Sequence, residues 1–176
     1  MDEDKKAEAE VEYEAVDAEL LAPDHEALDL KKANDFYELL REKITKWALE
    51  KGGEKGLKTA EILLLAPDLF MLLIRLLQDS RTPVNQKVWI GIGITYFISP
   101  LDLMPEAILG PFGYLDDVVL AVFIVNKILN SHKQLVLENW SGKGDVLTII
   151  QEVSAKAEEL VGKQIYKQLQ RIFDKK

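Results

Sequence analysis

The sequence contains no cysteine and only two histidines among its 176 residues. Without cysteine the chain cannot form disulfides, thiolate metal sites, a cysteine nucleophile or a thiol redox centre. His25 and His132 are too few for a metal site formed by several histidines, and they leave little basis for a Ser–His–Asp catalytic triad. These absences exclude many catalytic classes, while the length suffices for one domain with a full hydrophobic core.

Positive charge is also scarce, with 22 basic against 30 acidic residues and a net charge of -8. Because nucleic-acid binding needs a basic face, we expect no nucleic-acid partner. The acidity is local, since residues 1–29 carry 12 acidic and 2 basic side chains. Few apolar side chains lie among these carboxylates, so we predict that residues 1–32 form a disordered acidic tail. In the alternative, the tail docks as a short helix on a partner or second protomer through its apolar residues, Val11, Tyr13, Val16, Leu20 and Leu21.

Long hydrophobic runs are missing as well. The first strongly apolar run begins near Ile62 and the amino-terminal residues are highly charged, so we expect no cleavable signal peptide and a start in the cytosol. The longest uncharged run, Val88 to Leu101, has 14 residues, whereas a membrane-spanning helix needs about 20. Its length indicates a core helix or a re-entrant segment.

The apolar residues recur at three- and four-residue spacing, and no segment shows the strict alternation of a strand. The sequence therefore predicts an all-α fold. We expect a small helical bundle in which a central apolar helical hairpin is flanked by amphipathic helices. Its expected parts after the tail are an amphipathic helix within residues 33–56, a helical core over 57–131, and a long amphipathic carboxyl-terminal helix within 143–174 that packs on the core.

Capping residues and prolines give the expected helix ends. Asn34 is the expected amino-terminal cap of the first helix, and Gly52–Gly53 its stop. A second helix, 57–78, is interrupted at Pro67, and the next follows Thr82 as cap and Pro83 as first residue up to Ile98. Two more helices are expected, one from Asp116–Asp117 to about Asn130–Ser131 and one from Asp145 to Phe173 with Gly162 as its weak point.

Residues 99–117 hold three prolines and two glycines, while most of their other side chains are apolar. We predict an irregular connection here, with a one-turn helix at Ser99, Pro100 and Asp102 that Pro105 ends. A long apolar connection is unusual because loops normally face water, so it indicates a functional element.

This region carries a motif formed by Tyr96, Ser99, Pro100, Asp102, Pro105 and Glu106, followed by Gly113, Tyr114, Asp116 and Asp117. From Leu69 to about Val125 the chain resembles the YkvA-like family, a domain of unknown function. The family commonly has aspartate where this chain has Glu106, one methylene longer. The resemblance implies a small helical, often membrane-associated domain with no established catalytic activity.

Four carboxylates of this motif, those of Asp102, Glu106, Asp116 and Asp117, have several interpretations. Crowded at low dielectric, they would take up protons or bind a hard cation such as Mg²⁺, Ca²⁺ or Mn²⁺. Alternatively they cap helix starts, or they pair with cations drawn from Arg75, Arg81, Lys87 and Lys127. The hydroxyls of Tyr96 and Tyr114 are expected to hydrogen-bond these acids. No nucleophile or oxyanion donor accompanies them, so a hydrolase is the least favoured class and we expect no enzyme. His132 is given no chemical role.

Two functional classes remain open. The first is a non-enzymatic binding or scaffold module on the cytoplasmic face of a membrane, in contact with lipid or partner helices. It is favoured by carboxyl-terminal cations (Lys163, Lys167, Arg171, Lys175 and Lys176) beside apolar residues (Ile165, Leu169, Ile172 and Phe173), although a helix dipole also favours cations there. The alternative is a soluble cytoplasmic homo-oligomer whose acidic loop binds a divalent cation or small ligand.

Overall fold

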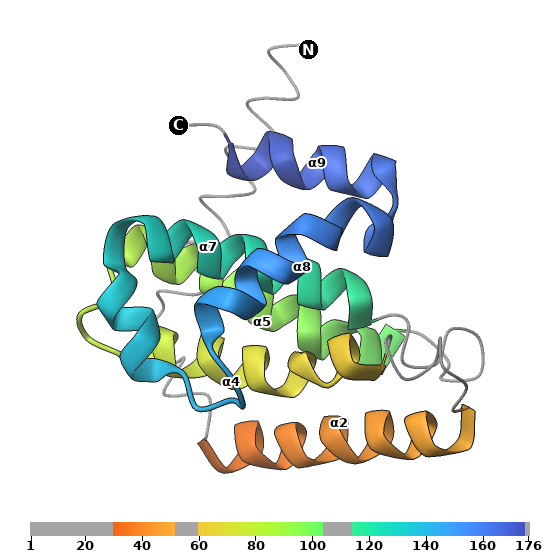
Figure 1. Cartoon of the computed structure of the whole chain (residues 1–176). Coiled ribbons are helices and arrows are strands. Elements are labelled where there is room, and N and C mark those ends of the chain that lie inside the picture. The colour runs from red at the N-terminus through yellow and green to blue at the C-terminus, as the bar shows by residue number, and fades with distance from the viewer. Residues whose placement is uncertain (1–29, 52–59, 104–113, 175–176) are drawn as a thin grey trace.

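The computed structural model of the chain describes residues 30–51, 60–103 and 114–174 (Figure 1). Six helices pack together over these residues, and none of the described residues forms a strand. They are α2 (Leu30–Lys51), α4 (Leu65–Gln78), α5 (Val84–Leu103), α7 (Tyr114–Asn139), α8 (Val146–Val161) and α9 (Lys163–Phe173). The predicted all-α fold is confirmed.

Helix α2 begins earlier than its sequence pattern indicated. Residues 30–32, assigned above to the tail, are its first turn, and Asn34 is an exposed residue inside the helix rather than its cap. Ala33 is buried against the core, so the apolar face extends past the expected start. The helix ends at Lys51, and the expected stop at Gly52–Gly53 lies outside the described residues.

The break expected at Pro67 lies three residues earlier. Residues 60–63 are helical, Leu64 is a turn, and α4 starts at Leu65. Pro67 is the third residue of α4, where a backbone N–H has no partner within the helix, so proline is tolerated there. Proline therefore belongs to the start of the new helix, and the chain turns before it.

Helix α5 differs from expectation at both ends. Thr82 does not cap it, because the Thr82 Oγ1 is buried without a hydrogen-bond partner among the described residues. Instead the Pro83 carbonyl accepts from the backbone N–H groups of Gln86 and Lys87, both at 3.0 Å, and the helix begins at Val84. At its far end α5 continues through Pro100 to Leu103, where a separate one-turn helix within an irregular connection was predicted. Pro100 has no N–H to donate to the Tyr96 carbonyl, and Tyr96 is exposed.

The carboxyl-terminal half follows its pattern more closely. Helix α7 has non-helical backbone angles at His132, next to the expected end at Asn130–Ser131, and then resumes to Asn139. The Asp145 side chain caps α8 by accepting from the Thr148 backbone N–H at 2.9 Å. Gly162 has φ 84° and separates α8 from α9, so the expected long helix is two helices with a sharp turn between them.

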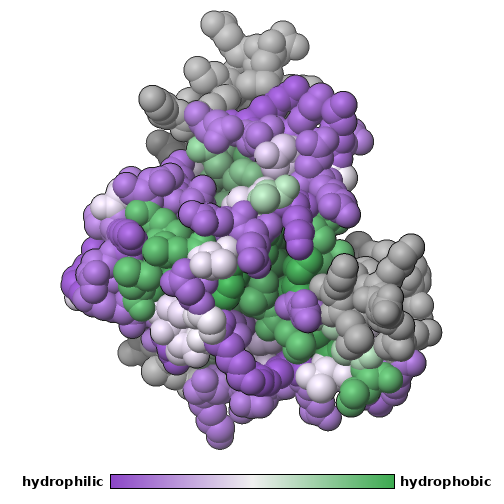
Figure 2. Space-filling view, in the orientation of Figure 1, coloured by the Kyte–Doolittle hydropathy of each residue, from purple (hydrophilic) through white to green (hydrophobic). Residues whose placement is uncertain are grey.

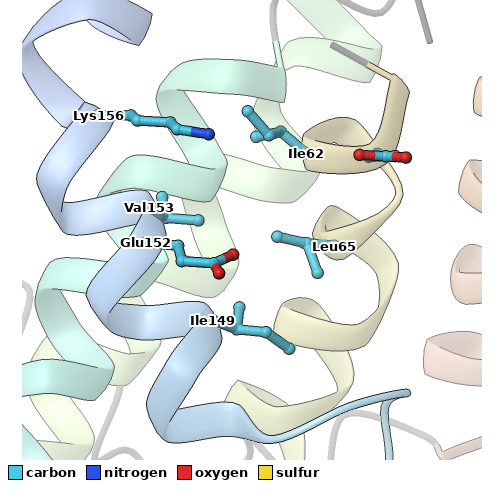
Figure 3. Close-up of a pocket in the computed structure, with 7 residues that line it drawn as sticks. Ile62, Leu65, Ile149, Glu152, Val153 and Lys156 are labelled. Carbon is cyan, nitrogen blue, oxygen red and sulfur yellow. The ribbon is translucent and has the colours of Figure 1, made fainter. Parts of the chain in front are cut away.

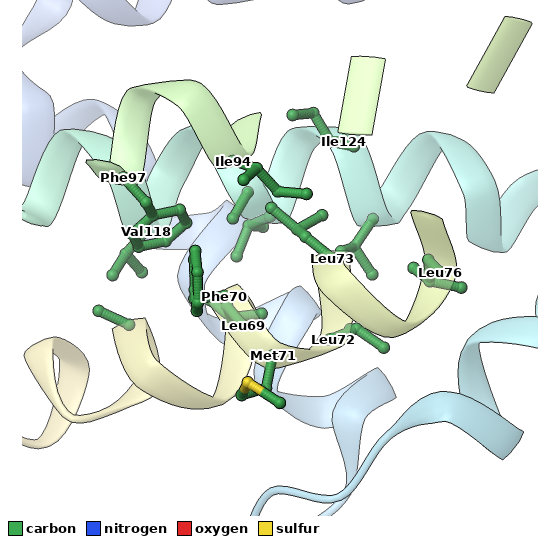
Figure 4. Packing of buried hydrophobic residues seen from close by; sticks show 14 of the residues in the cluster. Leu69, Phe70, Met71, Leu72, Leu73, Leu76, Ile94, Phe97, Val118 and Ile124 are labelled. Atoms are coloured by element: carbon green, nitrogen blue, oxygen red, sulfur yellow. The ribbon is translucent and has the colours of Figure 1, made fainter. Parts of the chain in front are cut away.

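The core is centred on α4, which packs against α2, α5 and α7 (Figure 4). Phe70 of α4 lies between two rings, with centroids 4.5 Å from Phe36 of α2 and 5.7 Å from Phe97 of α5. Gly93 lets α5 approach closely, since a Cβ there would lie 2.7 Å from the Ile124 Cδ1 of α7. The expected apolar hairpin of α5 and α7 therefore packs directly on α4.

Within the described part of the chain, no helix combines the length and apolar character needed to cross a membrane.

Candidate functional site

The residues of the predicted motif lie at one end of the α5–α7 hairpin. Tyr96 is in the second half of α5, with Ser99, Pro100 and Asp102 further along the same helix. Helix α7 opens with Tyr114 and carries Asp116 and Asp117 in its first turn. The predicted site residues Pro105, Glu106 and Gly113 lie outside the described residues.

Asp117 is the most unusual side chain of this group. It is only 2% exposed, and its Oδ2 has no hydrogen-bond partner among the described residues. Burial, and secondarily the charge of neighbouring Asp116, raises the pKa of Asp117 to about 8. Burial also raises the pKa of Asp116. At neutral pH this raised pKa favours the protonated, neutral form of Asp117.

Asp117 does not have the position or the state of a capping residue. Helix α7 begins at Tyr114, two residues before the aspartates, and Asp117 is its fourth residue. A capping carboxylate accepts backbone N–H bonds in its charged form, whereas the Asp117 side chain is buried and neutral. The pair Asp116–Asp117 instead places one acid at the surface and one in the core.

Several of the other expected partners of these acids make different contacts. Tyr96 is 57% exposed and forms no hydrogen bond to either described aspartate, while Tyr114 is buried. Arg81 pairs with Asp79 at 2.7 Å and Glu138 at 2.6 Å. Arg75 donates to the Asn139 carbonyl, and Lys127 lies over the rings of Trp89 and Phe173. Among the described residues, no group of three or more His, Asp or Glu side chains is placed to hold a metal ion.

Helix α9 presents a different kind of surface. None of its residues is buried, and it contains no acidic residue. Its cations Lys163, Lys167 and Arg171 follow one another at four-residue spacing and share one face, while Ile165 and Ile172, seven residues apart, share another. These two isoleucines are 38% and 40% exposed. We call the five residues the α9 surface, and Figure 2 shows hydrophilic residues over the outward side of this helix.

Aromatic contacts hold α9 on the bundle. The Phe173 ring centroid lies 5.0 Å from that of Trp89 in α5 and 5.7 Å from that of Phe123 in α7. The Tyr166 ring centroid lies 6.1 Å from that of Phe123. Lys127 stacks over Trp89 at 5.2 Å from the ring centroid, a favourable cation–π distance. Since these inner residues make the attachment, the isoleucines and cations of the α9 surface are available to a partner.

Helix α5 also has an apolar outward side. Val84 and Tyr96 are 60% and 57% exposed, and the half-buried Val88 and Ile92 lie between them at four-residue spacing. Trp89, the ring against which Phe173 packs, adjoins this row. An exposed uncharged helix face is uncommon in a water-surrounded bundle and indicates contact with a partner or lipid.

Sequence reasoning missed a polar cluster at the kink of α7. The His132 Nδ1 lies 2.9 Å from the Ser131 Oγ and 3.3 Å from the Gln86 Nε2, and Gln86 also donates to Ser131 at 2.9 Å. Gln86 is 8% exposed, and its Oε1 lacks a partner among the described residues. Gln86 lies between Asn85 and Lys87 in the sequence, so no local pattern marked it as buried. The cluster ties α5 to the kink.

A groove of about 350 Å³ lies between α8 and the start of α4 (Figure 3). Four apolar side chains and three charged ones line it: Ile62, Leu65, Ile149, Val153, Glu61, Glu152 and Lys156. Its charges have both signs and it brings no chemically reactive set together, so we assign it no site.

The fold and these surfaces define a small all-α protein with an acidic motif at a helical hairpin. Residues 86–123, which span most of that hairpin, match the model of a family described as "Protein of unknown function (DUF1232)". A similar protein is the "Uncharacterized protein ORF9" of Methanothermobacter thermautotrophicus, 24% identical over 87 residues. That match covers 49% of this chain and 60% of the relative, so the chain spans less than two thirds of the relative's length. No solved structure matches the chain.

Proposed function

We propose that the chain contains a YkvA-like domain and acts as a non-enzymatic binding module that attaches peripherally to the cytoplasmic face of a membrane. It binds anionic lipid through the α9 surface. The observation that carries this proposal is the composition of α9, an 11-residue helix without a buried or acidic residue that presents three cations and two half-exposed isoleucines.

The helix dipole does not account for these cations. A dipole favours cations only in the last turn of a helix, and Arg171 is the one basic residue in the last turn of α9. Lys163 is the first residue of α9, where the dipole disfavours a positive charge. An anionic surface gives all three cations a common partner, each contributing about 1 kcal/mol near the membrane.

The isoleucines supply the second attraction that stable membrane attachment needs. Ile165 and Ile172 are already partly exposed while Tyr166 and Phe173 hold the helix on the bundle, so binding requires no unfolding. The exposed apolar row of α5 adjoins the same region through Trp89.

Vesicle co-sedimentation tests the proposal. We expect the full chain to bind phosphatidylserine-containing vesicles but not phosphatidylcholine vesicles, and to release them when ionic strength rises from about 0.01 M to 1 M, because screening shortens the Debye length from about 30 Å to 3 Å. Lys163→Gln with Lys167→Gln should weaken binding by about 2 kcal/mol, since two cations are lost.

Matched controls come from α2, which lies on the opposite side of the bundle (Figure 1). Lys32→Gln with Lys46→Gln removes the same charge from exposed positions and should leave binding nearly unchanged. Ile165→Ser with Ile172→Ser should weaken binding, whereas Leu39→Ser with Leu49→Ser on α2 should not. Equal effects of the α2 and α9 variants, or no vesicle binding at low salt, would refute the proposal.

A second candidate function is that of a homo-oligomer whose acidic motif binds Mg²⁺ or Ca²⁺. The observation in its favour is the buried Asp117 Oδ2, which lacks a partner among the described residues and which a cation would satisfy. Binding would displace the Asp117 proton, so the melting temperature should rise with millimolar Mg²⁺ or Ca²⁺, and more at pH 8 than at pH 6. A melting temperature that changes neither with Mg²⁺ or Ca²⁺ nor with a chelator, at pH 6 and at pH 8, contradicts this function.

A further inference from the structure

Opposite charges are concentrated in two segments at the two ends of this sequence. Residues 1–29 have a net charge of -10, and residues 163–176 have a net charge of +4. The 133 residues between them carry a net charge of only -2. The acidic segment and the helix that carries the α9 surface therefore attract each other electrostatically.

The α9 surface also matches the acidic segment in its arrangement. Successive cations among Lys163, Lys167 and Arg171 are separated by about 6 Å along the helix axis at a rise of 1.5 Å per residue, and Ile165 and Ile172 lie on a different face of the same helix. Carboxylates and apolar side chains alternate closely in the acidic segment, as in Glu8, Glu10, Val11, Glu12, Tyr13, Glu14 and Val16. The acidic segment and the α9 surface therefore each offer both charged and apolar side chains for contact with the other.

The acidic segment is long enough to reach α9. It ends where α2 begins at Leu30, and 29 extended residues span up to about 100 Å. A folded domain of this size has a radius of gyration of only about 15 Å. Because the segment is tethered, its effective concentration at α9 is in the millimolar range, which favours the same chain over a second copy.

We propose that residues 1–29 bind the α9 surface of their own chain and compete there with anionic lipid. The binding of the acidic segment does not depend on lipid, whereas the competition rests on the proposed function. The acidic segment then acts as an internal inhibitor, which a sufficiently anionic membrane displaces.

Paramagnetic relaxation tests the contact without lipid. The chain has no native cysteine, so Glu12→Cys gives a single attachment point for a nitroxide label. We expect broadening of the backbone amide signals of Lys163, Lys167 and Arg171, and less of those of the exposed Lys133 and Lys143. High ionic strength should reduce the broadening. Equal broadening at both sets of residues overturns the contact.

Charge variants and mixed samples sharpen this test. Replacing the three α9 cations by glutamine in the labelled chain should abolish the excess broadening, whereas Lys133→Gln with Lys143→Gln should preserve it. A mixture of spin-labelled chain with isotope-labelled chain lacking the nitroxide should show no broadening at α9. Broadening in the mixture would mean that the segment binds a second copy and would overturn the intramolecular proposal.

Vesicle binding by the full chain tests the competition. Neutralising four tail carboxylates should tighten binding to phosphatidylserine vesicles at least about tenfold, because the cations are freed for lipid: Glu8→Gln, Glu10→Gln, Glu12→Gln and Glu14→Gln. The control neutralises four exposed glutamates elsewhere: Glu38, Glu42, Glu61 and Glu152. Equal tightening in both variants overturns the competition. If neither variant binds vesicles, the lipid function fails, while the relaxation experiment still decides whether the segment contacts α9.

Discussion

Helices α4 and α9 are both rich in large apolar side chains, yet they differ in how deeply these side chains are buried. Nine of the 14 residues of α4 are buried, whereas none of the 11 residues of α9 is. Helix α4 packs against α2, α5 and α7, while α9 contacts α7 and α8 and places aromatic rings against the bundle at its inner side. The difference indicates that α4 stabilises the fold and that α9 is an attached element with a surface left for interaction.

The largest expected effect concerns the buried acid of α7. The pKa of Asp117 is raised, so the folded state keeps a proton that the unfolded state loses above about pH 4. Stability should therefore fall by roughly 1.4 kcal/mol per pH unit as pH rises from about 4 to 8, and this loss should level off above pH 8.

Asp117→Asn removes this titration. The free energy of unfolding of the variant, measured by urea denaturation, should therefore rise relative to that of the natural chain as the pH increases from 5 to 8. The lowered pKa values of Asp79, Glu138 and Asp145 act in the opposite direction, with stability lost only below about pH 4, outside this window. Parallel stability curves for the two chains would show that Asp117 is not a buried neutral acid.

The next effect concerns the core. Phe70→Ala should lower the free energy of unfolding by about 3–5 kcal/mol, because the side chain is fully buried between Phe36 and Phe97. Chemical denaturation followed by circular dichroism measures this loss. Ile172→Ala in α9 is the matched comparison, and a loss of equal size there would mean that α9 is as much part of the core as α4.

A smaller effect is expected at the turn into α9. Gly162 has φ 84° and ψ 155°, a conformation restricted almost entirely to glycine, so Gly162→Ala should cost roughly 1–3 kcal/mol of strain. Because α9 buries no residue, the chain should relieve this strain by releasing the helix rather than by unfolding. Trp89 fluorescence should then shift as Phe173 leaves it, while the main unfolding transition stays in place. Unchanged fluorescence together with a lower unfolding transition would contradict a loosely held α9.

The smallest effect is expected from the cations of α9. Lys163→Gln with Lys167→Gln should change the free energy of unfolding by less than about 0.5 kcal/mol, because both side chains are exposed. Thermal unfolding measures this change alongside the vesicle assay. A large destabilisation would mean that the lysines stabilise the fold. A loss of vesicle binding in this variant could then no longer be assigned to the α9 surface alone.

Local patterns in the sequence predicted much of the helix order. The helix start at Asp145 and the weak point at Gly162 could be predicted because both residues act on their immediate neighbours. The prediction at Pro100 was wrong, because a proline usually ends a helix, whereas α5 continues through it to Leu103. The candidate site was less predictable, since Asp116 and Asp117 are adjacent in sequence but differ in burial.

The all-α class, the separation of charge along the chain and the amphipathic character of α9 follow from the sequence alone, because they depend on composition and on periodicity over a few turns. Only the tertiary structure decided that Asp117 is buried and neutral, that α4 is the centre, and that Ile165 and Ile172 stay exposed. These properties depend on which helices pack against one another. Such contacts join residues far apart in the chain, where local patterns carry no information.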